Sequence, residues 1–161
     1  MLAIGIDPGL SGGIFIYDAN NVAKAHGFAM PVKASHRQGK KEVDAEELAH
    51  ILSKYLSSGP RFFVEQVSSR PGQAAQFQFG VNYGVVLGVI GALGYIPTLV
   101  PPNVWKAAYS LKRSQDETLT QWKSRSIVLA EKLFPNYTFG KKDGIAEACL
   151  IAYYGAHATE S

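Results

Sequence analysis

The chain has 161 residues, of which 47% are hydrophobic and 18% charged, a composition typical of one globular domain that buries a core without disulfides. Its only cysteine, Cys149, cannot form an internal disulfide, which fits a reducing compartment. No apolar run reaches the about 20 residues that a membrane span needs, and no signal-peptide pattern is found, so a cytoplasmic location is expected.

The first third of the chain predicts a strand meander followed by a helix. Apolar residues form one short run and then alternate with polar ones around a glycine-rich turn, as in paired strands. Asp44 can cap the helix, with Glu47 as its reciprocal partner. The expected elements are strands over residues 1–6, 12–18 and 21–30, a polar, basic loop over 31–42, and a helix over 44–56.

The remaining residues predict strands that alternate with helices. The order β-β-β-α-β-α-β-α-α indicates a mixed α/β domain over residues 1–161, in which an antiparallel three-strand meander precedes the alternating helices and strands. This order matches an RNase H-like arrangement, although order alone also allows other α/β folds. Strands are expected over 61–67 and 95–100, and a polar loop over 68–76. Helices are expected from the end of this loop to about 93, and over 101–109, 114–134 and 143–158. The helix over 114–134 opens with an S-x-x-E capping box.

Four carboxylates are placed where a site can form. Asp7 ends the first strand and Glu65 lies near the end of a later one, and the carboxyl ends of strands are where open α/β sheets build sites. Asp143 and Glu147 are four residues apart on one helix, so their Cβ atoms lie about 5–6 Å apart and their charges repel. Divalent cations such as Mg²⁺ or Mn²⁺ would compensate that repulsion, and two such ions can stabilise the attacking and leaving oxygens in phosphodiester cleavage.

Each carboxylate also has a purely structural interpretation. Asp7 precedes Pro-Gly and could be a turn former, and Asp143 could be the N-cap of the last helix. Glu65 and Glu147 are harder to explain in this way, because both lie among apolar residues where an unpaired charge is costly to bury. Together the four favour a metal site. Removing them from the charge balance leaves nine acidic residues against sixteen basic ones, which suits an enzyme acting on a polyanion, although solvated basic loops would give the same balance.

Four motifs occur in order along nearly the whole chain: "IGIDPGLSGG", "FVEQV", "PPNVWK" and "KKDGIAEACLIA". In this combination the sequence resembles the RuvC-type Holliday junction resolvases, in their phage-like branch. The resemblance implies an RNase H-like fold, a homodimer, and Mg²⁺-dependent nicking of four-way DNA junctions in a bacterial or phage-infected cell, with Mn²⁺ as a substitute and no organic cofactor. The implied catalytic and metal-binding residues are Asp7, Glu65, Asp143 and Glu147. The last pair departs from the bacterial form, which is more closely spaced and ends in Asp.

The resemblance also suggests DNA contacts. Lys106 and Lys123 correspond to positions that contact DNA near the scissile phosphate, and both could instead be solvated helix lysines. Bacterial members carry an aromatic residue three positions after the strand glutamate, which acts as a wedge in the junction. This chain has Ser68 at that position. Phe77 and Phe79 could replace the wedge, but we prefer to interpret them as core residues. The further candidate DNA contacts are Arg70, Lys112, Arg113 and Arg125.

Two other functions and one surface remain open. A nuclease of the same fold could act on other branched or duplex DNA, and the first motif also resembles the phosphate loop of actin-like ATPases, whose duplicated domain does not fit in this chain. Gly80, Gly84 and Gly88 recur every fourth residue, and each costs about 1 kcal/mol in a helix relative to alanine. We therefore expect close packing there, against either the chain's own sheet or a partner helix. His36 and His50 are interpreted as surface residues and Cys149 as core.

Overall fold

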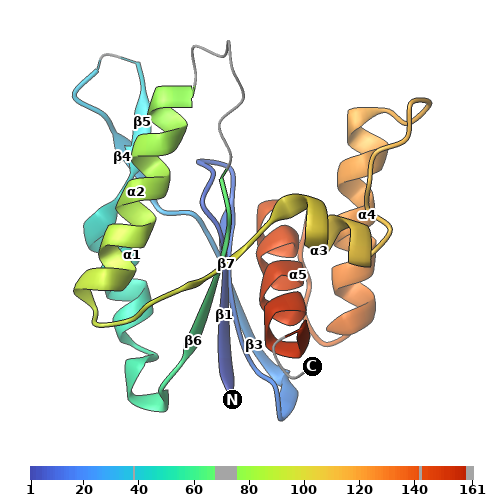
Figure 1. Ribbon diagram of the computed structural model, residues 1–161, viewed down its shortest axis with the longest axis horizontal. Coiled ribbons are helices and arrows are strands. Elements are labelled where there is room, and N and C mark those ends of the chain that lie inside the picture. The colour runs from blue at the N-terminus through green and yellow to red at the C-terminus, as the bar shows by residue number, and fades with distance from the viewer. Residues whose placement is uncertain (38, 68–75, 142, 159–161) are drawn as a thin grey trace.

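The computed structural model describes residues 1–37, 39–67, 76–141 and 143–158. A central sheet is sandwiched between two layers of helices (Figure 1). Its strand order is β3-β2-β1-β6-β7, with β1 antiparallel to β2 and parallel to β6. The mixed sheet with a leading antiparallel meander is thus confirmed. Its strands are β1 (Leu2–Asp7), β2 (Gly13–Asp18), β3 (Asn21–Ala29), β6 (Arg61–Glu65) and β7 (Thr98–Val100).

The helices divide between the two faces of the sheet. One face is covered by α1 and α2, and the other by α5, with α4 packed on its outer side and α3 near the end of β7 (Figure 1). No helix in the described ranges is both long and apolar enough for a membrane span. The helices are α1 (Ala45–Ser53), the short 3₁₀ turn η1 (Leu56–Ser58), α2 (Gln76–Ala92), α3 (Pro102–Ala108), α4 (Leu119–Leu133) and α5 (Asp143–Ala158).

The first two strands of the meander, β1 and β2, are buried on both faces. Because successive side chains point to opposite sides of a strand, Ile14 and Ile16 pack toward α1 and α2, whereas Phe15 and Tyr17 pack toward α4 and α5. All four side chains are at most 1% exposed. The sheet is therefore held rigidly between two apolar cores, and residues at the ends of its strands have fixed positions.

At a few glycines, helix α5 lies directly against the backbone of the sheet and of the β1–β2 turn. A Cβ atom at Gly5 would overlap the carbonyl oxygen of Ala148, and one at Gly144 would overlap that of Ser11. An isolated β-bridge between Gly12 and Gly144 joins the start of α5 to the β1–β2 turn. Glycine at these positions lets two backbones touch, so the first turn of α5 is placed directly beside the end of β1.

Two expectations about local structure were wrong. The expected loop at 31–42 contains a small hairpin of β4 (Val32–Ala34) and β5 (Lys41–Val43), whose strands are too short to give a periodic signal. Helix α4 begins at Leu119 and not at Ser114. The sequence contains a second capping pattern, Thr118 with Gln121, four residues after the one that begins at Ser114. The structure uses this second pattern as the N-terminal cap of α4.

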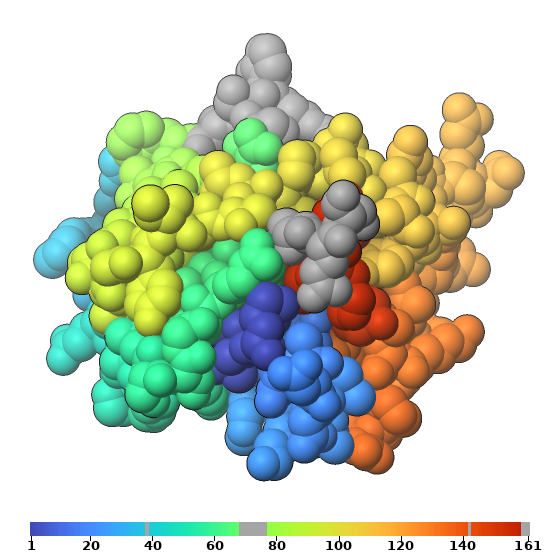
Figure 2. Space-filling view, turned by 60° about the horizontal axis from the view of Figure 1, so that its bottom comes forward, coloured from blue at the N-terminus to red at the C-terminus, as the bar shows by residue number. Residues whose placement is uncertain are grey.

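The opposite end of the molecule is closed by the N-terminus. Figure 2 shows the first residues, in dark blue, between the segment that enters β6 and the β2–β3 turn. The amino group of Met1 lies 3.4 Å from Asp18, and the guanidinium of Arg61 lies 3.7 Å from the Met1 sulfur. This end holds the start of the sheet together, far from the carboxyl ends of β1 and β6.

Candidate active site

Two carboxylates end neighbouring parallel strands. Asp7 is the last residue of β1 and Glu65 the last residue of β6, and the register between β1 and β6 places both at the same edge of the sheet. The backbone N–H of Gly9 donates to Asp7 Oδ1 at 3.1 Å, so the glycine-rich turn after β1 fixes the orientation of this carboxylate. Asp7 therefore both stabilises the turn after β1 and belongs to the carboxylate cluster.

The other two carboxylates come from α5. Asp143 is its first residue and Glu147 follows one turn later, and the contact of Gly144 with the β1–β2 turn brings both to Asp7. Glu147 is only 12% exposed and Asp143 22% exposed. Residues from three separate elements thus meet at one end of the sheet.

The cluster carries more negative charge than its surroundings accommodate. Burial, reinforced by the charges of Glu65 and Asp143, raises the pKa of Asp7 to about 6, against the opposing effects of the Gly9 N–H and Lys106. Burial also raises the pKa of Glu65 and of Glu147. A site that resists ionisation in this way favours a cation in its centre.

Lys106 supplies one such cation. Its ammonium lies 3.7 Å from Glu65 Oε1 and 3.6 Å from Glu147 Oε2, so it bridges the carboxylates of β6 and α5. It also lies 4.9 Å from the ring centroid of Trp105 and 5.1 Å from that of Trp122, within the range of cation–π attraction. Lys106 is therefore enclosed by two acids and two aromatic faces.

A second lysine and the two tryptophans complete the surroundings. Lys123 of α4 lies 2.9 Å from Asp143, and this hydrogen bond raises the pKa of Lys123. The indole N–H of Trp105 donates to Glu65 Oε1 at 3.2 Å, and that of Trp122 donates to the Leu111 carbonyl at 2.6 Å. We did not assign a role to either tryptophan from the sequence, although each directly precedes a lysine singled out there.

The donor set suits a hard divalent cation. All four acids offer carboxylate oxygens, which Mg²⁺ and Mn²⁺ prefer. The raised pKa values of Asp7, Glu65 and Glu147 show a charge excess that such an ion relieves. In the geometry shown, lysine ammonium groups stand among the acids, and no three His, Cys, Asp or Glu side chains in the described part of the chain are grouped as a metal-binding set. Ion binding in the centre therefore requires Lys106 to release at least one glutamate.

A cleft of about 580 Å³ opens over three of the four acids. Asp7, Asp143 and Glu147 lie in it, together with the glycine-rich turn after β1. One wall comes from α4 through Trp122 and Lys123, and the other comes from α2 and the β4–β5 hairpin. The arrangement can hold a polyanion against buried carboxylates, with cations available on the walls.

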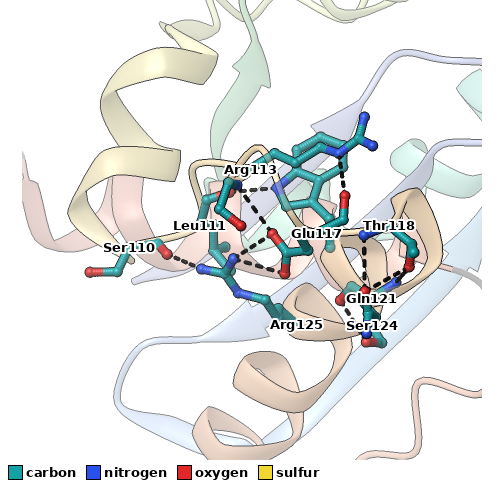
Figure 3. A network of polar contacts seen from close by, with 10 residues as sticks. Ser110, Leu111, Arg113, Glu117, Thr118, Gln121, Ser124 and Arg125 are labelled. Carbon is teal, nitrogen blue, oxygen red and sulfur yellow. Dashed lines mark hydrogen bonds and ion pairs between the residues drawn. The ribbon is translucent and has the colours of Figure 1, made fainter.

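The other predicted DNA contacts lie elsewhere. Nη1 of Arg125 donates to both carboxylate oxygens of Glu117, at 2.9 and 3.0 Å, and Nη2 donates to the Ser110 carbonyl (Figure 3). Arg113 donates to the Glu117 carbonyl at 3.1 Å. This network fixes the segment before α4 and does not line the cleft. Lys112 is exposed in the same segment, and Arg70 lies outside the described residues.

The aromatic residues at the start of α2 are not in the core. The preferred interpretation of Phe77 and Phe79 as core residues was wrong, because they are 68% and 38% exposed, and Phe79 lines the cleft. Ser68 lies outside the described residues. His36 and His50 are exposed and Cys149 is fully buried, as expected.

Comparisons with known proteins identify the fold. No family model matches the sequence, and no curated protein matches it. The structure is similar to Thermus thermophilus RuvC in complex with a Holliday junction substrate, with a TM-score of 0.65 and 19% identity over 99% of this chain and 98% of that one. A second Thermus thermophilus RuvC structure gives a TM-score of 0.59 and 20% identity with the same coverage. The chain therefore has the mixed α/β, RNase H-like fold of RuvC.

Proposed function

We propose that residues 1–161 form a single-domain, structure-selective endonuclease that resolves four-way DNA junctions by paired symmetric nicks, using divalent metal ions. The observation that carries this proposal is the meeting of Asp7, Asp143 and Glu147 in a cleft, with lysines beside them. Glu65 ends the strand next to Asp7 and shares Lys106 with Glu147. The RuvC structure that resembles this one was solved with a Holliday junction. Acids with cations beside them suit the binding and cleavage of a phosphodiester.

Each side chain has a defined task in this proposal. Asp7 and Glu65 hold the ions, and Asp143 and Glu147 complete the ligand shell. When bound, the metal stabilises the charge that develops on the attacking and leaving oxygens. Trp105 orients the Glu65 carboxylate through its N–H, and Lys106 and Lys123 bind phosphate oxygens once they leave the carboxylates that they neutralise.

A nicking assay tests the proposal. A synthetic four-way junction is incubated beside a flap and a linear duplex of the same sequence, with Mg²⁺ or with chelator. We expect paired nicks in the junction only when Mg²⁺ is present. Equal cutting of flap or duplex would favour a less selective nuclease of this fold, and intact DNA under all conditions would refute a nuclease function.

We also propose that two copies act together, because paired nicks need two active sites. The outer face of α2 supports this. Cβ atoms built at Gly80, Gly84 and Gly88 would meet no atom of the described residues within 4 Å, so the chain's own sheet does not explain the glycine stripe. Val81, beside the stripe, is 40% exposed. A helix that is apolar on all sides normally has a partner on each face.

Sedimentation equilibrium at micromolar concentration tests the dimer, with and without junction DNA. We expect a two-fold assembly in the presence of DNA at the least. Gly84→Asp places a charge in the centre of the outer face without filling space inside the chain, and it should dissociate the dimer. A monomer under both conditions would contradict the proposal.

A further inference from the structure

The β4–β5 hairpin is fastened to the layer of α1 and α2 beside the cleft. Asn82 of α2 is only 2% exposed, and its Oδ1 accepts the backbone N–H of Val43 at 3.2 Å. At the base of the hairpin, the N–H of Asp44 donates to the Pro31 carbonyl at 2.9 Å. A buried amide used in this way ties β5 and the base of the hairpin to a rigid helix.

The turn of this hairpin brings two cations to the cleft. Arg37 and Lys40 line it together with Asp7, Asp143 and Glu147. Both are exposed, and neither has a carboxylate within 4 Å among the residues that the structure describes. Lys123, on the opposite wall, is held by Asp143. The hairpin thus offers cations that no acid of the described chain neutralises.

The guanidinium of Arg37 is partly oriented in advance. It lies 5.7 Å from the ring centroid of Phe77, which is itself 68% exposed. Stacking on an aromatic face leaves the hydrogen-bonding edges of a guanidinium free, and the planar fork fits two oxygens of one phosphate. An exposed aromatic ring covered by an arginine that has no acidic partner among the described residues adds nothing to the core and suits the binding of an anion.

We propose that the β4–β5 hairpin is a phosphate-binding wall of the cleft, at which Arg37 and Lys40 contact backbone phosphates of a nucleic-acid strand. The contacted phosphates flank the one at the carboxylates, on the side opposite α4. This inference rests on the proposed nuclease function, and it adds a strand-binding element that the sequence motifs do not include. The wall recognises the backbone and not the bases, so it contributes affinity without sequence preference.

The test compares two double variants of equal charge change. In Arg37→Ala/Lys40→Ala the hairpin loses both cations, and in the control, Lys54→Ala/Lys132→Ala, two exposed lysines outside the cleft are lost. Binding to a fluorescent four-way junction is measured by anisotropy in EDTA across a salt series, and the fold is checked by circular dichroism. The hairpin variant should bind about tenfold more weakly at about 50 mM salt, with a slope of log affinity against log salt flattened by about two. The control should keep the wild-type slope.

The outcomes separate this proposal from the proposed function. If the wild type nicks the junction and the hairpin variant binds like the control, the hairpin wall is refuted and the nuclease function stands. If both double variants weaken binding equally, overall charge and not the hairpin is responsible, which also refutes the wall. If the hairpin variant alone loses DNA affinity and the wild type cuts no DNA, the wall is supported and the nuclease function fails.

Discussion

Replacing Asp7 with asparagine is expected to stabilise the metal-free protein while abolishing its nicking activity. The pKa of Asp7 rises from an ordinary 3.8 to about 6 in the folded state, mainly through burial. Each pKa unit corresponds to about 1.4 kcal/mol, so ionised Asp7 disfavours folding by about 3 kcal/mol above pH 6. Asparagine has the same shape, can still accept the Gly9 N–H, and carries no charge.

The sign of the pH dependence follows from the raised pKa. The unfolded carboxyl loses its proton near pH 4 and the folded one near pH 6, so the wild type loses stability as the pH rises through this window. The advantage of Asp7→Asn should be about 3 kcal/mol at pH 8 and about 1 kcal/mol at pH 4.5. For a chain of this length, the pH 8 difference corresponds to about 6–12 °C in Tm.

Urea denaturation in EDTA at both pH values measures the effect. Asp18→Asn is the matched control, because the Asn20 N–H holds the pKa of this surface carboxyl below its ordinary value, and its removal should not stabilise. Mg²⁺ should stabilise the wild type more than Asp7→Asn, and the variant should bind the junction without cutting it. Equal stability of wild type and Asp7→Asn at pH 8 in EDTA, or near-normal nicking by the variant, would refute the reasoning.

Four further substitutions test the site and the segment beside it. Lys106→Met leaves two buried glutamates without their shared cation and should cost about 3 kcal/mol in EDTA, measured by urea denaturation, with a smaller loss in Mg²⁺. Lys123→Ala should flatten the salt slope of junction binding by about one, and an unchanged slope would leave it a solvated lysine. Arg125→Ala should lower stability by about 1–3 kcal/mol and leave that slope unchanged, because its guanidinium is already engaged. Gly144→Ala should cost about 1–3 kcal/mol and reduce kcat sharply while a folded signal remains, since the added methyl displaces α5 from the β1–β2 turn; unchanged kcat would show that this contact does not position the acids.

The placement of the acids could be predicted from the sequence because their local patterns, taken together, point to one end of the sheet. Asp7 and Glu65 end buried apolar runs, and parallel strand ends share an edge. The bounds of α5, Asp143–Ala158, follow from its acidic start and its long apolar run. The sequence does not reveal how closely α5 packs on β1. The positions of glycines alone do not indicate which segment of backbone lies beside them.

The walls of the cleft could not be predicted, because they depend on tertiary contacts. The hairpin strands are three residues long, and the bond from Val43 to Asn82 that holds them joins residues 39 positions apart. Arg125 is indistinguishable in sequence from a DNA-binding arginine until Glu117 is seen beside it. Phe77 and Phe79 occur in an apolar helix, and only the packing shows which of its faces is uncovered.

The contact of α5 with bare backbone has a consequence for how this protein tolerates change over evolutionary time. Gly5 and Gly144 set the distance between β1 and α5 by main-chain atoms, which every sequence shares, and not by the volume of any interposed side chain. Drift among the large core residues can therefore alter the outer layers without moving Asp7 relative to Glu147. Selection on the geometry of this site then falls on a few glycines and acids, which leaves most of the remaining sequence free to diverge.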